Sequence, residues 1–272
     1  MVRREAGVGR RLTRRQRGQA VRAAQYTVLA AAVLALALLA NWQRIGDAFF
    51  DVDVIRELFP EVITVALKNT VLYTLCAFGF GLVLGLVIAL MRLSPVAAYR
   101  ALATVYIEFF RGVPALLVLI GFGYGIPIAL NTELPGGTLG TITVALGLVA
   151  AAYMAETFRA GIQAVPKGQM EAARSLGMSH GRAMISIVIP QAFRITLPPL
   201  TNEHVLLTKD SSLVYLLGVT LPTRELAKFG RDSLNQYVSM TPILIAGLAY
   251  LIITVPLGYV VRRLEAQQAK AR

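Results

Sequence analysis

Long apolar runs separated by short charged segments dominate the pattern of this chain. Five windows contain no Asp, Glu, Lys or Arg, and they cover residues 23–43, 69–91, 112–132, 134–155 and 233–261. A sixth window, 195–223, is also apolar in outline but is interrupted by Glu203, Lys209 and Asp210. Because it lies between 134–155 and 233–261, it is the fifth predicted span in chain order. A membrane helix needs about 20 apolar residues, because each residue advances about 1.5 Å through about 30 Å of hydrocarbon. The pattern therefore predicts an all-α integral membrane protein with six transmembrane helices.

The polar stretch between the fourth and fifth predicted spans has structure of its own. A turn at 166–168 precedes a short helical pattern at 169–176, and Gly177 can end that helix because glycine adopts the left-handed conformation without steric cost. Ser179 is placed to cap a second helix, which Pro190 is expected to end. A helix this short is not stable alone in water. We therefore expect it to dock on another surface.

The composition excludes several classes of protein. Hydrophobic residues make up 56% of the chain and charged residues only 15%, with a mean hydropathy of +0.62. Soluble domains carry about 25% charged residues, so neither a soluble enzyme nor a disordered chain fits. The single cysteine, Cys76, rules out an internal disulfide, and two histidines leave little for a metal site. We expect no metal site and no catalytic residues.

The net charge of +12 describes orientation. Twenty basic residues fall on one side of the predicted helices, against six on the other and Lys209 within a span. Because Lys and Arg accumulate in cytoplasmic loops, both termini are predicted to be cytoplasmic. The segments on that side are 1–25, 92–112, 157–194 and 262–272.

The first apolar run, 23–43, is longer than the core of a signal peptide and lacks a clear cleavage site, so we predict a retained helix. The Arg-rich segment 1–22 before it has no interleaved aromatic residues. We therefore interpret this segment as an anchor to anionic lipid and not as a nucleic-acid arm.

Polar residues within the membrane are the candidates for a transport pathway. In the fifth span, Thr201, His204, Thr208 and Ser211 follow at steps of three, four and three, which places them on one helical face. Such a stripe should face a water-filled path or partner helices, because unpaired polar groups are costly in lipid. Adjacent candidates are Lys209, Asp210 and Ser212, although Lys209 and Asp210 could instead lie at the outer mouth or pair with neighbouring helices.

Glu156, at the inner end of the fourth span, has two possible roles. It could recognise the ammonium group of an amino acid, or it could pair with Arg159, three residues further along the same helix.

The long loop resembles a known family. Glu171-Ala172-Ala173 is followed after three residues by Gly177, and Ile187 and Ile189-Pro190 come next at the spacing of the EAA loop of bacterial ATP-binding-cassette (ABC) importer permeases. Phe109–Pro114, Ala155–Ile162, Pro190–Arg194 and Lys209–Leu213 are similar to segments of the polar-amino-acid branch of that family, and the resemblance covers about residues 61–262.

The resemblance implies a type I ABC importer permease fold. The expected parts are a basic segment (1–22), an additional helix (23–43), a permease core (61–262) containing the cytoplasmic loop 157–194, and a cytoplasmic tail (263–272). It also implies that the short helix of the loop couples to an ATPase subunit through Gly168, Glu171, Ala172, Ala173 and Gly177. The fifth span would contribute to the substrate pathway.

The implied complex lies in the bacterial inner membrane. The expected partners are ABC ATPase subunits, an identical or homologous permease in a dimer, an extracytoplasmic solute-binding protein, a polar amino acid and membrane lipid, but no nucleic acid. The chain lacks the G-x-x-x-x-G-K-[ST] loop. We therefore expect no cofactor on this non-enzymatic chain, with ATP and Mg bound by the ATPase.

Two other classes remain open. An ion-coupled secondary transporter could use Lys209, Asp210 and Glu156 as a relay, and it would show inverted internal repeats, which the sequence does not display. A non-transporting scaffold would leave the polar stripe without a purpose. The carried amino acid is not readable from the sequence, since Lys209 would favour a carboxylate and every amino acid has one.

Overall fold

A computed structural model describes residues 13–270, so the first twelve residues of the predicted basic segment and the last two of the tail lie outside it. The chain divides into two units between Ala48 and Phe49. The first unit contains the long helix α1 (Arg14–Leu39), followed by α2 (Trp42–Phe49), which ends at the boundary. Thr13 caps α1: its side chain accepts a hydrogen bond from the Gln16 N–H, and the Gln16 Oε1 accepts one from the Thr13 N–H.

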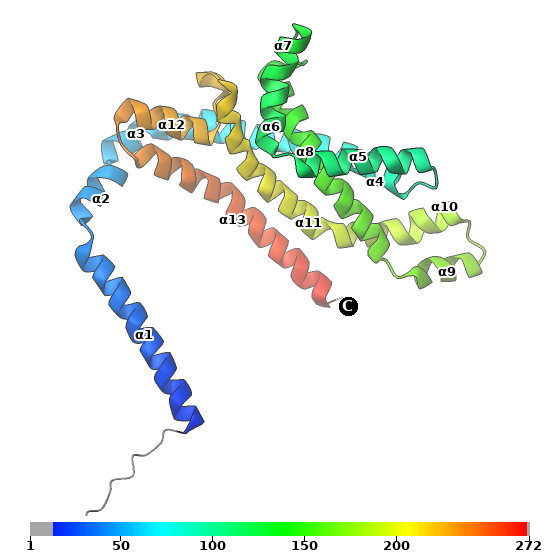
Figure 1. Cartoon of the computed structure of the whole chain (residues 1–272), viewed down its shortest axis with the longest axis horizontal. Helices are drawn as coiled ribbons and strands as arrows, with labels where there is room; N and C mark the ends of the chain where they lie inside the picture. Colours follow the sequence, from blue (N-terminus) through cyan, green and yellow to red (C-terminus); the bar gives the residue numbers. More distant parts are fainter. Residues whose placement is uncertain (1–12, 271–272) are drawn as a thin grey trace, which may run out of the picture. The chain divides into compact units, whose positions relative to one another are not determined.

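The second unit begins with a helical rod that pairs with a later helix. This rod comprises α3 (Val52–Glu61), a π-helical turn (Val62–Leu67) and α4 (Lys68–Leu93). Along its length α4 packs against α8 (Gly137–Ala164), as Figure 1 shows. Small residues permit this close packing. A Cβ added at Gly85 would lie 3.0 Å from the Ala151 carbonyl oxygen.

The third predicted span, 112–132, forms a helical arm that is shorter than predicted and covers only 115–130. α5 (Ala97–Gly112) and a second arm are joined at a bend of 102°. The second arm consists of α6 (Ala115–Ile120), a π-helical turn (Gly121–Gly125) and α7 (Ile126–Leu130). The cause is Pro114, which disfavours the helical conformation in the residue before it. Val113 is accordingly extended, with φ −93° and ψ 131°.

The expectation that Pro190 ends a helix is also wrong. After α9 (Lys167–Ser175), a single rod runs from α10 (His180–Ala183) through a π-helical turn (Met184–Val188) and α11 (Ile189–Asp210) into a 3-10 turn (Ser211–Leu217). Proline lacks an N–H and its ring collides with the carbonyl four residues earlier in an α-helix. The carbonyl four residues before Pro190 belongs to Ser186, which lies in the π-helical turn. Because this turn is wider than an α-helical one, the proline ring is accommodated and the rod continues.

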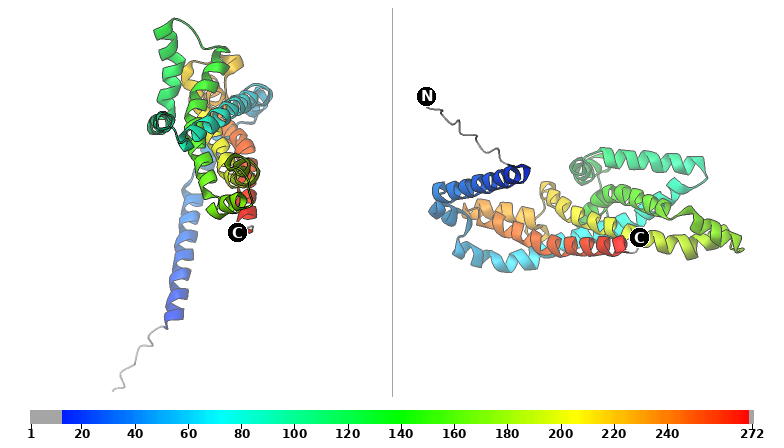
Figure 2. Two further views of the ribbon diagram at one scale, coloured as in Figure 1. Left: turned by 90° about the vertical axis from the view of Figure 1, so that its right-hand side faces the viewer. Right: turned by 90° about the horizontal axis from the view of Figure 1, so that it is seen from below.

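The last segments are a 3-10 turn (Leu221–Thr223), α12 (Leu226–Tyr237) and the long α13 (Thr241–Lys270). α13 lies beside both α11 and α12 (Figure 2). Among the described residues, five continuous helical segments are long and apolar enough to cross a membrane, or six if the bent pair counts as one span. The all-α, six-span prediction is therefore confirmed, and the interrupted fifth span does form.

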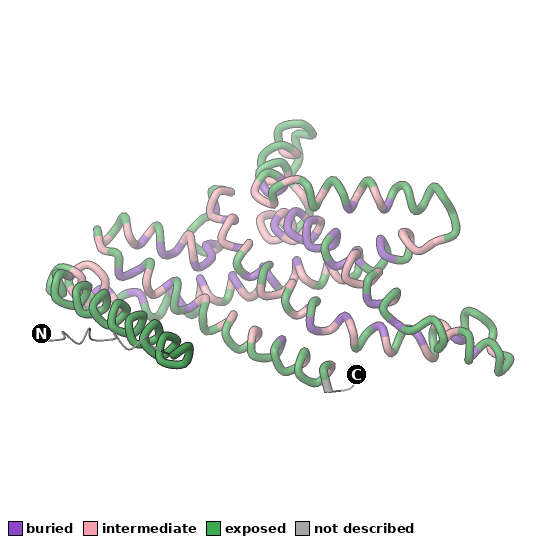
Figure 3. Tube along the Cα trace, turned by 60° about the horizontal axis from the view of Figure 1, so that its bottom comes forward, coloured by how far each residue is buried: buried purple, intermediate pink, exposed green. Residues whose placement is uncertain are grey.

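The main apolar core lies between α4, α8 and α11, where buried residues alternate with exposed ones along each helix (Figure 3). Tyr73, Leu146, Met154 and Leu207 are among its members. A second cluster joins α3, α12 and α13, around Leu58 and Phe229. The first of these cores contains the helices α8 and α11, which line the candidate site.

Candidate functional site

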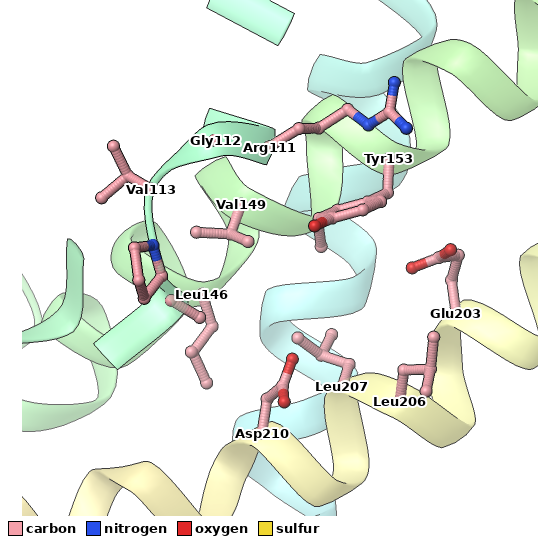
Figure 4. A pocket seen from close by; sticks show the side chains of 13 residues that line it. Arg111, Gly112, Val113, Leu146, Val149, Tyr153, Glu203, Leu206, Leu207 and Asp210 are labelled. Carbon is pink, nitrogen blue, oxygen red and sulfur yellow. The ribbon is translucent and has the colours of Figure 1, made fainter. Parts of the chain in front are cut away.

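A cavity of about 470 Å³ opens where the bend after α5 meets α8 and α11 (Figure 4). Three stretches of the chain supply its lining, and the residues are Arg111, Gly112, Val113, Pro114, Ala115, Leu146, Val149, Ala150, Tyr153, Glu203, Leu206, Leu207 and Asp210. Most of the wall is apolar, but one basic side chain, Arg111, and two acidic ones, Glu203 and Asp210, also line it. Such an arrangement suits a small ligand with charged groups and an aliphatic part.

The bend at Pro114 brings Arg111 to this cavity. The helix α5 ends at Gly112, and the Val113 N–H donates to the Phe109 carbonyl at 3.0 Å. The Arg111 guanidinium lies over the Tyr153 ring, 5.5 Å from its centroid. Glu108 lies three residues before Arg111 on α5, but the two form no ion pair in the part of the chain that the structure describes.

One face of α11 supplies the two carboxylates. Glu203 and Asp210 are seven residues apart, which is about two helical turns, so they lie on the same side of the helix. Both are half-buried, and between residues 13 and 270 neither forms an ion pair with another side chain. The helices α8 and α11 run antiparallel: Gly161 contacts Thr196, which places Tyr153 opposite Glu203 and Leu146 opposite Asp210.

The four residues of the polar stripe predicted on the fifth span do not line this cavity. Thr208 and Ser211 are fully buried, and their hydroxyls donate to the carbonyls of His204 (2.8 Å) and Thr208 (2.7 Å). The Thr201 hydroxyl donates to the Leu197 carbonyl at 2.8 Å. These threonine and serine donors are therefore satisfied by their own helix. The His204 ring meets Phe78 edge-on, at 4.7 Å between centroids.

The remaining candidates are dispersed. Lys209 is exposed and lies outside the cavity, and Ser212 is half-buried. Glu156 accepts from the Arg159 guanidinium at 2.6 Å, so the intrahelical pair considered from the sequence does form. Among the eight predicted pathway residues, only Asp210 lines the cavity, and the pathway role of the others stays a prediction.

Sequence reasoning missed Glu203 and Arg111 as cavity residues. A signal for Glu203 exists, since it precedes Asp210 by two helical turns and both interrupt an apolar span. Arg111 carries no such signal, because its place depends on the angle of the bend at Pro114.

The short helix α9 presents one face outward. Gly168, Glu171 and Ala172 are exposed, whereas Ala173 is 6% exposed and Met170 packs on the apolar cluster formed by Val165, Val188 and Ala192. Ala173 is therefore buried within this chain, and only Ala172 is exposed to a partner protein.

The end of α9 is fixed by Gly177. Its φ of +85° is left-handed, and its N–H donates to the Arg174 carbonyl at 3.0 Å. The Met178 N–H donates to the Ala173 carbonyl at 3.1 Å, which completes a Schellman motif. The predicted glycine stop is therefore confirmed, and it holds Leu176, 85% exposed, at the tip of the loop.

Residues 81–270 match the family described as binding-protein-dependent transport system inner membrane component. The probable glutamine ABC transporter permease protein GlnM of Bacillus subtilis is 38% identical over 203 residues, covering 75% of this chain and 91% of that protein. The arginine transport system permease protein ArgU of Corynebacterium glutamicum is 35% identical over 240 residues, covering 82% and 74%.

A solved structure described as an amino acid ABC transporter with histidines superimposes with a TM-score of 0.71 at 32% identity, covering 80% of this chain and 98% of that one. The MetNI methionine ABC transporter, at 18% identity and a TM-score of 0.63, shares the fold.

Proposed function

We propose that this chain, which belongs to the family of binding-protein-dependent transport system inner membrane components, is the permease subunit of an ATP-driven ABC importer for amino acids. The observation that carries this proposal is α9: a short helix, ended by Gly177 and buried on one side, whose other side is open to a partner. Membership in this family does not fit the ion-coupled alternative.

The exposed face of α9 is the proposed docking site for a separate ATPase subunit. Glu171 offers a carboxylate to a cation of the partner, and Gly168 and Ala172 permit a close approach. Because α9 also packs against the π turn that leads into α11, a push on α9 is transmitted to the helix that carries Glu203 and Asp210. This contact links nucleotide-driven movement to the cavity.

The rest of the complex follows from the same proposal. Two permease subunits, identical or homologous, form the pathway, and an extracytoplasmic binding protein delivers the amino acid. ATP and Mg are bound by the ATPase, and this chain is not itself an enzyme. Both termini lie in the cytoplasm, on the side of α9.

Charge reversal on α9 tests the proposal. The wild-type permease, its ATPase and its binding protein are reconstituted in proteoliposomes, and ATP-dependent uptake of labelled amino acids is measured. We expect Glu171→Arg to lower uptake by about tenfold, the effect of losing one charge-assisted contact of about 1.4 kcal/mol, and to weaken co-purification of the ATPase.

Glu265→Arg is the matched control, because Glu265 is also exposed and lies on the same proposed side, at the end of α13. Full uptake by the Glu171→Arg complex would contradict the docking site. Absence of ATP-dependent uptake in the wild-type complex, across the common amino acids, would contradict the function.

A further inference from the structure

The cavity beside Pro114 has an uneven charge. Its ionisable lining groups are one guanidinium, Arg111, and two carboxylates, Glu203 and Asp210, together with the phenol of Tyr153. The nearby ion pair of Glu156 and Arg159 is balanced. With its acids ionised, the lining therefore carries one surplus negative charge.

Neighbouring charges outside the lining do not cancel this surplus. The Arg92 guanidinium donates to the Thr104 hydroxyl and is absent from the cavity wall. Lys209 follows Glu203 on the same helix but is exposed on another side. Lys209 therefore adds no positive charge to the lining of this cavity.

An amino acid brings charges that can be compared with this lining. The α-carboxylate needs a cation and the α-ammonium an anion, so a neutral amino acid would occupy Arg111 and one carboxylate. The second carboxylate would then remain without a partner in a partly desolvated site, which is unfavourable. An acidic amino acid would add a further negative charge, whereas a basic one would supply the missing positive charge.

We infer that this cavity selects amino acids with a cationic side chain, such as arginine or lysine, with Arg111 binding the α-carboxylate and Glu203 and Asp210 sharing the two cationic groups. This inference rests on the proposed function and names the substrate class of the same site. The guanidinium–carboxylate pairing is geometrically specific as well as strong.

The dimensions of the site agree with this assignment. Glu203 and Asp210 are separated by about 10 Å along α11, since seven residues each advance about 1.5 Å. The α-ammonium and the distal cation of an extended basic amino acid can therefore meet different carboxylates. Between them, Leu146, Val149 and Leu206 provide an apolar wall for the methylene groups of the side chain.

The test compares arginine with citrulline, which has nearly the same shape but a neutral side chain. Both are titrated onto the purified permease–ATPase complex in lipid nanodiscs without binding protein, so that only the permease selects. We expect arginine to bind about tenfold more tightly than citrulline, because one charge-assisted contact distinguishes them. We expect glutamate to bind more weakly than either.

Glu203→Gln and Asp210→Asn each remove the surplus charge and should bring the arginine-to-citrulline ratio close to one. Citrulline binding reports whether each variant retains a folded cavity. Glu108→Gln is the control, because it removes a carboxylate from the exposed side of α5.

Two outcomes would overturn the inference and leave the proposed function intact. In the first, citrulline or glutamate binds as tightly as arginine or more tightly. In the second, no amino acid binds to the complex. In both, ATP-dependent uptake is preserved. Loss of uptake together with loss of binding in the wild-type complex would instead contradict the proposed function.

Discussion

The side chain of Glu225 is completely buried at the start of α12. Its carboxylate accepts from the backbone N–H groups of Lys228 (2.8 Å) and Ala227 and from the Tyr250 hydroxyl (3.0 Å). Burial nevertheless outweighs these hydrogen bonds and raises the pKa of Glu225 to about 7. The residue therefore ties α12 to α13 through a group that changes charge near neutral pH.

Glu225 should make stability fall as the pH rises. The unfolded chain releases this proton near pH 4.5 and the folded chain only near pH 7, so the folded state loses an advantage of about 1.4 kcal/mol per pH unit within that window. The check is thermal unfolding of the detergent-solubilised protein between pH 5 and pH 8. Glu225→Gln should flatten the decline, and an unchanged slope in that variant would contradict the assignment.

Residue-level prediction from the sequence succeeded where chemistry is local. Gly177 was expected to end a helix and has the left-handed backbone that this requires. Asp210 was a candidate and lines the cavity, but Glu203 was treated only as an interruption of an apolar run. Assigning Glu203 to the site requires the pairing of α8 with α11, which the sequence alone does not reveal.

At the scale of elements, the packing of α4 on α8 depends on individual glycines. A Cβ at Gly85 would lie 3.0 Å from both the Ala151 carbonyl oxygen and the Met154 Cβ, whereas nothing lies within 4 Å of a Cβ at Gly79. The two glycines are six residues apart in the same helix. They therefore separate the effect of contact from the effect of helix propensity.

Gly85→Ala should destabilise the protein by about 1–3 kcal/mol, because the methyl group meets backbone atoms that cannot give way. Gly79→Ala, the matched control, should cause no loss, because the position is open and alanine favours the helix. Thermal unfolding of both variants in one detergent measures the difference. Equal melting temperatures would contradict the close packing of α4 on α8.

Helices were predicted well from hydropathy, while their continuity was not. The run 112–132 has the length of a span, but the chain bends at Pro114 near its start, so the helical arm covers only 115–130. Pro190 was expected to end a helix, yet a π turn absorbs it. Both prolines are visible in the sequence, but Pro114 acts through the extended Val113 before it, whereas Pro190 is accommodated because the preceding turn widens.

At the scale of the whole molecule, the bias of twenty basic residues against six gives the chain its proposed orientation. The structure offers two exposed reporters for the two sides. Leu176, at the tip of the loop after α9, is 85% exposed, and Val238, at the end of α12, is 91% exposed. The helix α11 and the turns that follow it separate these positions along the chain.

Cysteine labelling should read this orientation directly. In a Cys76→Ala background, a membrane-impermeant maleimide applied to intact cells should modify Val238→Cys and should reach Leu176→Cys only after permeabilisation. The physical reason is that the reagent cannot cross the hydrocarbon layer. The reverse pattern would place α9 outside and contradict both the topology and the proposed contact with the ATPase.

The π turn at Met184–Val188 also sets the rotational phase of everything that follows it. Each residue of an α-helix turns the chain by about 100°, so the extra residue held in the wide turn decides which side of α11 points to which neighbour. With that residue absorbed, Glu203 and Asp210 point into the cavity while Thr208 is buried elsewhere. If the turn tightened to an ordinary helix, the carboxylates would swing to a different side without any change in their own sequence. A local change in helical winding beside α9 thus alters the angular position of the charges at Glu203 and Asp210, which lie 15 and 22 residues beyond the end of the π turn.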